Sequence, residues 1–288
     1  MAAATGVPRF LVRNARARGV ILAYHNVVPD ADAGRGDRSL HLPLSTFRGQ
    51  LDLLQQCAEV VPLMPLLDRE TETPGVLRAA VTFDDAYRGA IDLGLAEVVT
   101  RGLPATVFVA PSFLGGRDFW WDVLAAPPGE LAAGIRDVGL GELGGDDESI
   151  RSWAVRQGLK LGTSPDIMRC STEIELRAAA AKGRVTLASH TWSHRNLRVL
   201  EPPDVDTEVG KAADWVRMVG GEGSVVAYPY GLAPRVTTSL AACGHRFGLL
   251  VAGGRLRAHW DTVAVPRINV PAGLSPEGLL LRLSGLMR

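Results

Sequence analysis

Short apolar segments alternate with longer amphipathic segments along most of the chain. Each apolar segment has few polar positions, which is typical of a strand that is buried on both faces of a sheet. Such segments cover residues 19–25, 59–63, 79–83, 105–109, 185–189, 224–228, 247–251 and 262–265. Because segments with helical character lie between them, the pattern predicts a parallel sheet with helices outside it.

The predicted helices begin at recognisable signals. Ser45 is expected to cap one helix, and Thr172 and Glu175 have the spacing of a capping box at the start of another. Ser275 is the expected N-cap of the final helix, because a proline follows it at the first helical position. The predicted helices cover residues 45–57, 87–101, 172–181, 204–219, 234–242 and the segment that follows residue 275.

One segment, residues 112–170, interrupts this alternation. It is rich in glycine, proline and acidic residues, and Phe119, Trp120 and Trp121 lie near its start. We interpret the segment as a partly helical insertion between barrel units that lies over the mouth of the barrel. The three aromatic residues are more typical of a core than of a surface for stacking sugars. No repeat or linker divides the chain, so we expect residues 1–288 to form a single α/β domain.

Chemically notable residues follow four of the predicted strands. In parallel sheets and barrels, functional groups gather at the carboxyl ends of the strands. We therefore expect these residues to lie close together in space. They are His25, Asp84 with Asp85, His190 with His194, and the segment from Tyr228 to Tyr230.

The histidine pair and the aspartate pair together predict a metal site. Imidazoles four residues apart, such as His190 and His194, can share one metal ion, and a carboxylate would strengthen the site. Asp84 and Asp85 repel each other at the end of a buried strand, and a divalent cation would relieve that cost. The alternatives are an aspartate that only caps a helix and a turn whose histidines pack against Trp192. We favour one aspartate as a metal ligand and its neighbour as a base.

Three further residues could complete the site. His25 alone would be a structural histidine, but its position at the same barrel end indicates a catalytic group. Tyr230 either packs in its turn or offers its backbone N–H to a developing oxyanion. Arg267 is either a surface charge or the partner that keeps Asp84 ionised and oriented.

Composition narrows the class of partner. The chain has 31 lysine and arginine residues and 31 acidic residues, so no net field favours nucleic acid, and a neutral or weakly charged substrate fits better. Three widely separated cysteines without a CxxC pair favour reduced thiols over a disulfide framework.

The N-terminal segment lacks the long apolar core of a signal peptide, and no apolar run approaches the ~18 residues of a membrane span. We therefore expect a cytoplasmic protein. Four N-terminal arginines could contact an anionic membrane surface, although we favour a solvated terminus. They are Arg9, Arg13, Arg16 and Arg18. A cytoplasmic enzyme would act on a nucleotide-linked, lipid-linked or small glycosylated intermediate rather than on cell-wall polymer.

Three motifs make the sequence resemble the polysaccharide deacetylase family, the NodB-homology carbohydrate esterases. Residues 82–85 (TFDD) match the first motif, residues 189–194 (SHTWSH) match the second, and residues 228–231 (YPYG) match the tail of the third. The resemblance implies a distorted (β/α)7-type barrel that removes N-acetyl or O-acetyl groups from sugars with the help of a divalent metal.

The resemblance also assigns roles to individual residues. It implies that Asp84 is the general base and that Asp85, His190 and His194 bind the metal. The arginine that often begins the third motif is replaced by Ala227, and we propose that Arg267 supplies its charge from the last strand. The usual C-terminal Leu-x-His motif is missing as well.

Residues 23–27 (AYHNV) resemble the N-terminal segment of the circularly permuted branch of the family, in which the first strand supplies the histidine. His25 would then be the general acid.

The leading prediction is a hydrolase that removes an acetyl group from a sugar or a glycosylated intermediate. The expected cofactor is Zn²⁺, with Co²⁺, Ni²⁺ or another divalent ion as alternatives. Two other functions stay open: hydrolysis of a non-sugar amide or cyclic imide by the same site, and an inactive barrel that only binds glycan. We find no Gly-x-Ser-x-Gly elbow, which disfavours a serine hydrolase. The sequence does not predict the oligomeric state.

Overall fold

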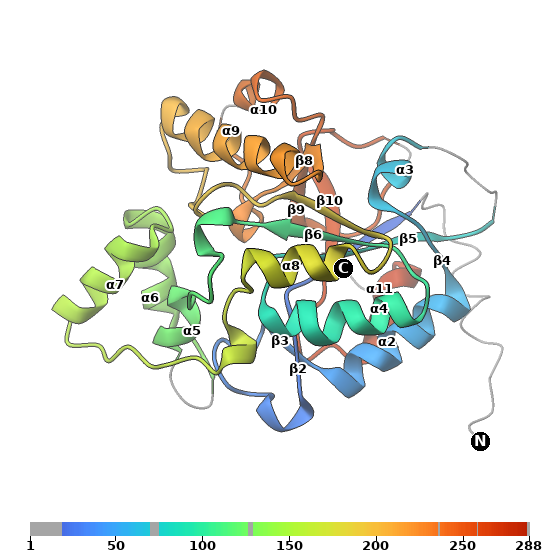
Figure 1. The fold of residues 1–288 in the computed structure, drawn as a ribbon, viewed down its shortest axis with the longest axis horizontal. Coiled ribbons are helices and arrows are strands. Elements are labelled where there is room, and N and C mark those ends of the chain that lie inside the picture. The colour runs from blue at the N-terminus through green and yellow to red at the C-terminus, as the bar shows by residue number, and fades with distance from the viewer. Residues whose placement is uncertain (1–18, 70–74, 126–128, 236, 258, 287–288) are drawn as a thin grey trace.

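Seven parallel strands close into a barrel in the computed structural model of the chain (Figure 1). The structure describes residues 19–69, 75–125, 129–235, 237–257 and 259–286. Around the barrel the strands are β1 (Val20–Tyr24), β10 (Val265–Asn269), β9 (Phe247–Gly253), β8 (Glu222–Ala227), β7 (Val185–Ser189), β6 (Ala105–Val109) and β5 (Arg78–Phe83). The barrel closes because β5 pairs with β1 as well as with β6. This architecture confirms the predicted (β/α)7 fold class.

Three short strands lie outside this ring. β4 (Glu59–Val60) pairs with the start of β5, while β2 (Asn26–Val28) and β3 (His41–Pro43) form a separate two-stranded parallel sheet. The predicted strand over residues 59–63 is therefore too long. It is cut short because Pro62 is the N-cap of the next helix.

Helices surround the barrel. The helices of four or more residues on its outside are α2 (Leu44–Cys57), α3 (Leu63–Leu67), α4 (Leu95–Thr100), α8 (Glu173–Ala180), α9 (Pro202–Met218), α10 (Thr238–Ala242) and α11 (Pro276–Ser284). A π-helical segment, η2 (Ala90–Gly94), precedes α4 within the predicted helix over residues 87–101. Shorter 3-10 segments are η1 (Asp30–Asp32), η3 (Pro111–Phe113), η5 (Asp166–Met168) and η6 (Pro229–Gly231).

The capping predictions have mixed outcomes. The Thr172–Glu175 capping box is present, and the Ser275 side chain accepts a hydrogen bond from the Gly278 N–H, so both are confirmed. The prediction for Ser45 is wrong: α2 begins one residue earlier and no side chain caps it. The Ser45 N–H instead donates to a carboxylate oxygen of Asp30, at 3.0 Å.

The predicted last strand, residues 262–265, is also misplaced. Asp261 accepts hydrogen bonds from the backbone N–H groups of Val263 and Ala264, so this segment turns instead of extending. β10 starts only at Val265, and Arg267 consequently lies within the strand instead of after it. The helix predicted over residues 234–242 is likewise shorter, since α10 begins at residue 238.

Strand register brings the predicted site residues to one edge. Tyr24 of β1 pairs with Phe83 of β5, and Val109 of β6 pairs with Ser189 of β7. The residues that follow these strands therefore emerge at the same carboxyl end of the barrel. The core beneath them is densely aromatic, with Phe83 packed against Tyr24 at a ring-centroid distance of 5.7 Å.

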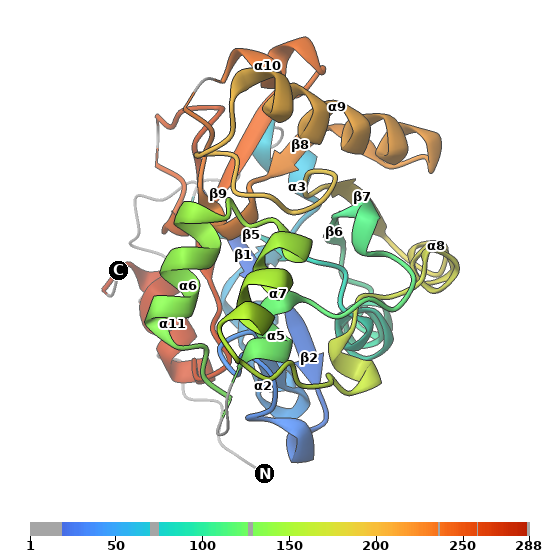
Figure 2. The ribbon, with the colours of Figure 1, turned by 90° about the vertical axis from the view of Figure 1, so that its left-hand side faces the viewer.

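The insertion covers this end. Its helices are α5 (Trp120–Leu124), α6 (Ala133–Asp137) and α7 (Asp147–Arg156), with a π-helical segment, η4 (Val138–Glu142), after α6. Figure 2 looks at this side of the molecule and shows α5, α6 and α7 in front of the strands. In the part of the chain that the structure describes, none of the helices combines the length and the hydrophobicity that a membrane span requires. The four N-terminal arginines lie outside the described residues.

We expect Thr172→Ala to lower the free energy of unfolding by about 1 kcal/mol, because it removes the side-chain half of the capping box. Thr237→Ala is the matched control, since Thr237 is the N-cap of α10 but makes no side-chain capping bond. Denaturant unfolding of both variants measures the difference. Equal losses in the two variants would contradict the assignment.

Candidate active site

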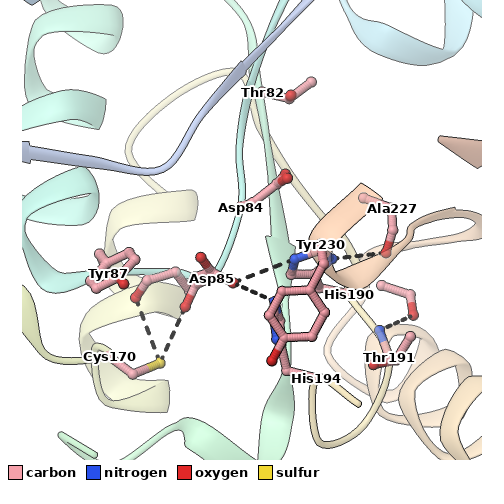
Figure 3. A network of polar contacts seen from close by, with 12 residues as sticks. Thr82, Asp84, Asp85, Tyr87, Cys170, His190, Thr191, His194, Ala227 and Tyr230 are labelled. Carbon is pink, nitrogen blue, oxygen red and sulfur yellow. Dashed lines mark hydrogen bonds and ion pairs between the residues drawn. The ribbon is translucent and has the colours of Figure 1, made fainter. Parts of the chain in front are cut away.

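Three buried side chains from two strand ends converge on one point. One oxygen of Asp85 lies 3.0 Å from Nε2 of His194 and 3.4 Å from Nε2 of His190 (Figure 3). One donor atom from each of the three residues lies within 4.8 Å of the others. The arrangement places the three predicted metal ligands together.

The His190 ring is oriented for ligation. Its Nδ1 lies 2.8 Å from the carbonyl oxygen of Ala227. A carbonyl only accepts, so Nδ1 carries a proton and Nε2, on the side of Asp85, is the nitrogen that a metal ion could bind. A hydrogen bond of this kind commonly fixes the ring of a metal-ligating histidine.

Burial and charge act on these groups in opposite directions. Burial alone would raise the pKa of the Asp85 carboxyl, but the neighbouring His194 and His190 hold it well below its usual range. Burial lowers the pKa of His194. For His190, burial works in the same direction but Asp85 and Asp84 outweigh it, so the pKa is raised. The cluster therefore combines a carboxylate with two imidazoles whose charge depends on it.

The backbone is unusual around these groups. Among the described residues, six that are not glycine have a positive φ, and five of them belong to this region: Asp85, Ala86, Thr191, His194 and Tyr230. Such left-handed conformations are uncommon for residues with a Cβ and persist when surrounding contacts enforce them. The two predicted ligand segments are thus held in conformations that a free loop would avoid.

The donor set fits a divalent cation such as Zn²⁺. Two imidazole nitrogens and a carboxylate oxygen are ligands that zinc prefers, and three protein ligands leave a position open for chemistry. The facing oxygen of Asp85 is buried and, although both imidazoles lie within ion-pair distance of it, makes no hydrogen bond with the described residues. Because a buried carboxylate oxygen is costly without a partner, a cation there would satisfy it.

Asp84 points to a different partner. Its two oxygens accept hydrogen bonds from Nη1 and Nη2 of Arg267, at 2.8 and 2.7 Å. The guanidinium is fully buried and also donates to the hydroxyl of Thr82 and the carbonyl of Leu250. The fork geometry leaves other lone pairs of the carboxylate available, since two oxygens offer about four acceptor positions.

Arg267 determines the charge of Asp84. Burial alone would raise the pKa of Asp84, but Arg267, with help from His190 and His25, lowers it below its ordinary value. The carboxylate therefore stays ionised at neutral pH. The arrangement matches the interpretation of Arg267 as the partner of Asp84 rather than a surface charge.

The structure places the two remaining predicted residues at the same end of the barrel. His25 lies between β1 and β2, is partly exposed, and is close enough to contribute to the lowered pKa of Asp84. Tyr230 lies in η6, with its ring 4.6 Å from that of His194. The Tyr230 hydroxyl accepts a hydrogen bond from the indole N–H of Trp120, at 3.1 Å, so the insertion contacts this turn directly.

Cys170 contacts the site although the sequence did not identify it as a site residue. The thiol of Cys170 is buried and donates to the carbonyl oxygens of Asp85 and Ala86, at 3.4 and 3.7 Å (Figure 3). The end of the insertion thereby supports the left-handed segment that presents Asp85. No sequence signal identifies the contact, because 85 residues separate the partners.

Arg267→Met should leave the Asp84 carboxylate buried without its partner. We expect the free energy of unfolding to fall by about 3–5 kcal/mol near pH 7 in protein free of added metal. In the native chain, the lowered pKa of Asp84 stabilises the folded state at pH values above the ordinary pKa of aspartate. This stabilisation is lost as the pH falls through the lower pKa that Asp84 has in the folded state. In the variant, burial raises the pKa instead, so the destabilisation should shrink toward acidic pH.

Denaturant unfolding across the pH range from neutral to about 4 measures this difference. Arg255→Met is the control, since Arg255 is partly buried but has no ion-pair partner among the described residues. A destabilisation by Arg267→Met that does not change with pH would contradict the pairing.

Solved structures with the same fold were found across several bacteria. The deacetylase PplD of Streptococcus pyogenes, solved in complex with acetate, is 18% identical with a TM-score of 0.62, over 92% of this chain and 97% of that chain. IcaB of Ammonifex degensii is 18% identical with a TM-score of 0.64, over 93% and 97%. A de-N-acetylase of Aggregatibacter actinomycetemcomitans is 15% identical with a TM-score of 0.60, over 92% and 99%.

At these identities the likeness establishes the fold alone. A search of curated proteins found no match. The family model for polysaccharide deacetylase matches residues 72–248, which is more than half of the chain and includes Asp84, Asp85, His190, His194 and Tyr230. β1 with His25 and β10 with Arg267 lie outside the matched range. The chain belongs to the polysaccharide deacetylase family.

Proposed function

We propose that this protein is a metal-dependent deacetylase that removes an N-acetyl group from an amino sugar, with an O-acetyl group as the alternative. Family membership implies a hydrolase that acts on amide or ester bonds. The observation that carries the proposal is the cluster of Asp85, His190 and His194 beside the Arg267-bound Asp84. PplD, which shares the fold, binds acetate, the product that such a reaction releases.

The metal site is assigned to Asp85, His190 and His194. A divalent cation held there would polarise the acetyl carbonyl and lower the pKa of a water molecule toward neutrality. The residues present the donor chemistry that such an ion requires, and the Ala227 carbonyl holds one of the imidazoles in the ligating tautomer.

Asp84 is the proposed general base. Its lowered pKa keeps it ionised, so it can accept the proton of the attacking water at neutral pH. Arg267 holds the carboxylate in one orientation through two hydrogen bonds, which limits the motion of the accepting oxygen.

Tyr230 and His25 complete the reaction. The backbone N–H of Tyr230 is proposed to donate to the oxyanion that develops on the acetyl carbonyl. His25 is proposed to protonate the departing amine, which then leaves as a free amino sugar. With Asp84 as the base, these groups add a hydrogen-bond donor to the oxyanion and an acid at the same barrel end.

The overall charge of the chain bears on the substrate class. A net charge of zero gives no field that would favour a polyanion, so a neutral or weakly charged N-acetylhexosamine derivative fits better. We propose an acetylated sugar or a glycosylated intermediate as the substrate. Acetate release from nucleotide-linked, lipid-linked and polymeric acceptors compares the candidates, and exclusive activity on polymer would contradict it.

Asp84→Asn should reduce kcat for acetate release by about 10²- to 10⁴-fold, the usual contribution of a general base. Zinc binding should persist in this variant, because Asp84 is bonded to Arg267 and not to the histidines. Asp85→Asn should lose zinc and activity together. Acetate release from N-acetylhexosamine derivatives and metal analysis of the purified proteins measure both properties.

Asp214→Asn is the control for this series, since Asp214 has 81% of its side chain exposed and should behave as the native protein. His25→Gln should reduce kcat for acetate release, because the variant has no acidic proton to give to the departing amine. Full activity in Asp84→Asn would rule out the proposed base. A native protein that binds zinc but hydrolyses no acetylated sugar would favour a glycan-binding barrel or a non-sugar amide.

A further inference from the structure

The two histidines of the proposed metal site are held in different ways. Nδ1 of His190 is bonded to a backbone carbonyl, whereas Nδ1 of His194 is buried and has no hydrogen-bond partner among the described residues. The His194 ring instead packs against two aromatic side chains, Tyr230 and Trp121, whose own ring centroids are 5.9 Å apart. Tyr230 meets it edge-on with ring centroids 4.6 Å apart, and Trp121 contacts it at 5.0 Å. Apart from the contact of its Nε2 with Asp85, packing against these rings sets the angle of this imidazole.

Trp121 is fixed by a buried hydrogen bond. Its indole N–H donates to the hydroxyl of Tyr87, at 2.7 Å, and that hydroxyl donates to a carboxylate oxygen of Asp122, at 2.8 Å. The three side chains are no more than 5% exposed. An indole N–H can only donate and an ionised carboxylate can only accept, so the direction of both bonds is determined.

The carboxylate at the end of this chain is itself held in place. Its other oxygen accepts hydrogen bonds from Nε2 of His41 and from the backbone N–H of Asp37, both at 2.8 Å. Nδ1 of His41 in turn accepts from the side-chain amide of Asn26, at 3.1 Å. The network thus connects the insertion to β2 and β3, and every bond in it is buried.

Tyr87 also lies only two residues after Asp85. Its backbone pairs with that of Cys170 in an isolated bridge, next to the left-handed Asp85 and Ala86. One residue therefore connects the aspartate segment of the site with the indole that packs against His194.

We propose that Tyr87 is a positioning residue for the metal site: its hydroxyl holds Trp121 against His194 and so presets the angle of that imidazole. The inference rests on the proposed metal site. Residues that orient a ligand commonly change metal affinity by about 10- to 100-fold when they are removed. We expect the hydroxyl of Tyr87 to contribute at the lower end of that range, since the aromatic ring remains.

Tyr87→Phe tests this inference against Tyr24→Phe. Both side chains are fully buried tyrosines, but the Tyr24 hydroxyl has no hydrogen-bond partner among the described residues. The zinc dissociation constant is measured by competition with a chromophoric chelator, starting from metal-free protein. We expect about a tenfold increase for Tyr87→Phe and no more than a twofold change for Tyr24→Phe. A Tyr87→Phe protein that folds and binds zinc within twofold of the native value would overturn the proposal.

Trp121→Phe approaches the same hydrogen bond from its other end and tests the inference even if Tyr87→Phe fails to fold. It too should weaken zinc binding, and native affinity in this variant would equally overturn the proposal.

If both single variants fold, the double variant should weaken zinc binding much less than the product of the two single effects, because both substitutions remove the same hydrogen bond. If the two effects on the zinc dissociation constant multiply fully, the hydrogen bond between Trp121 and Tyr87 is not the cause of the weaker binding. Neither readout involves hydrolysis, so native protein that binds zinc without releasing acetate would overturn the proposed function and leave this inference intact.

Discussion

The convergence of one carboxylate and two imidazoles at a buried barrel end is the constraint on which the rest of the site depends. Asp85, His190 and His194 bring their donor atoms within 4.8 Å of one another in a region with almost no access to water. Burying these groups destabilises the folded state unless their charges are paired and their polar atoms are hydrogen-bonded or bound to a cation. The neighbouring features, from left-handed backbone to fixed tautomer, are consistent with a site that is built to hold a cation.

The two adjacent aspartates of the site have different electrostatic partners. Asp85 faces the histidines, while Asp84 faces the buried guanidinium of Arg267. Because side chains of adjacent residues point apart at a strand end, one residue can serve as a ligand while the next stays ionised beside a permanent positive charge. Arg267 comes from β10 rather than from the motif at Ala227, so the same charge enters from another strand.

The fold and the proposed ligands could be predicted because their signals are local. Apolar strands end directly before Asp84 and His190, and parallel register then brings these ends together. The location of Arg267 was predicted less well, because the turn at Asp261 moved the last strand. The contacts of Cys170 and of Trp121 could not be predicted at all, since they join the insertion to residues that are distant in sequence. Such contacts depend on tertiary packing and leave no periodic pattern in the sequence.

The central claim is that one cation is shared by two histidines and an aspartate. X-ray absorption spectroscopy of protein loaded with one equivalent of zinc tests it most directly, since imidazole ligands give a characteristic multiple-scattering signal. We expect two imidazole nitrogens on zinc in the native protein and one in His194→Ala. A zinc shell without imidazole, or one that is unchanged in His194→Ala, would contradict it.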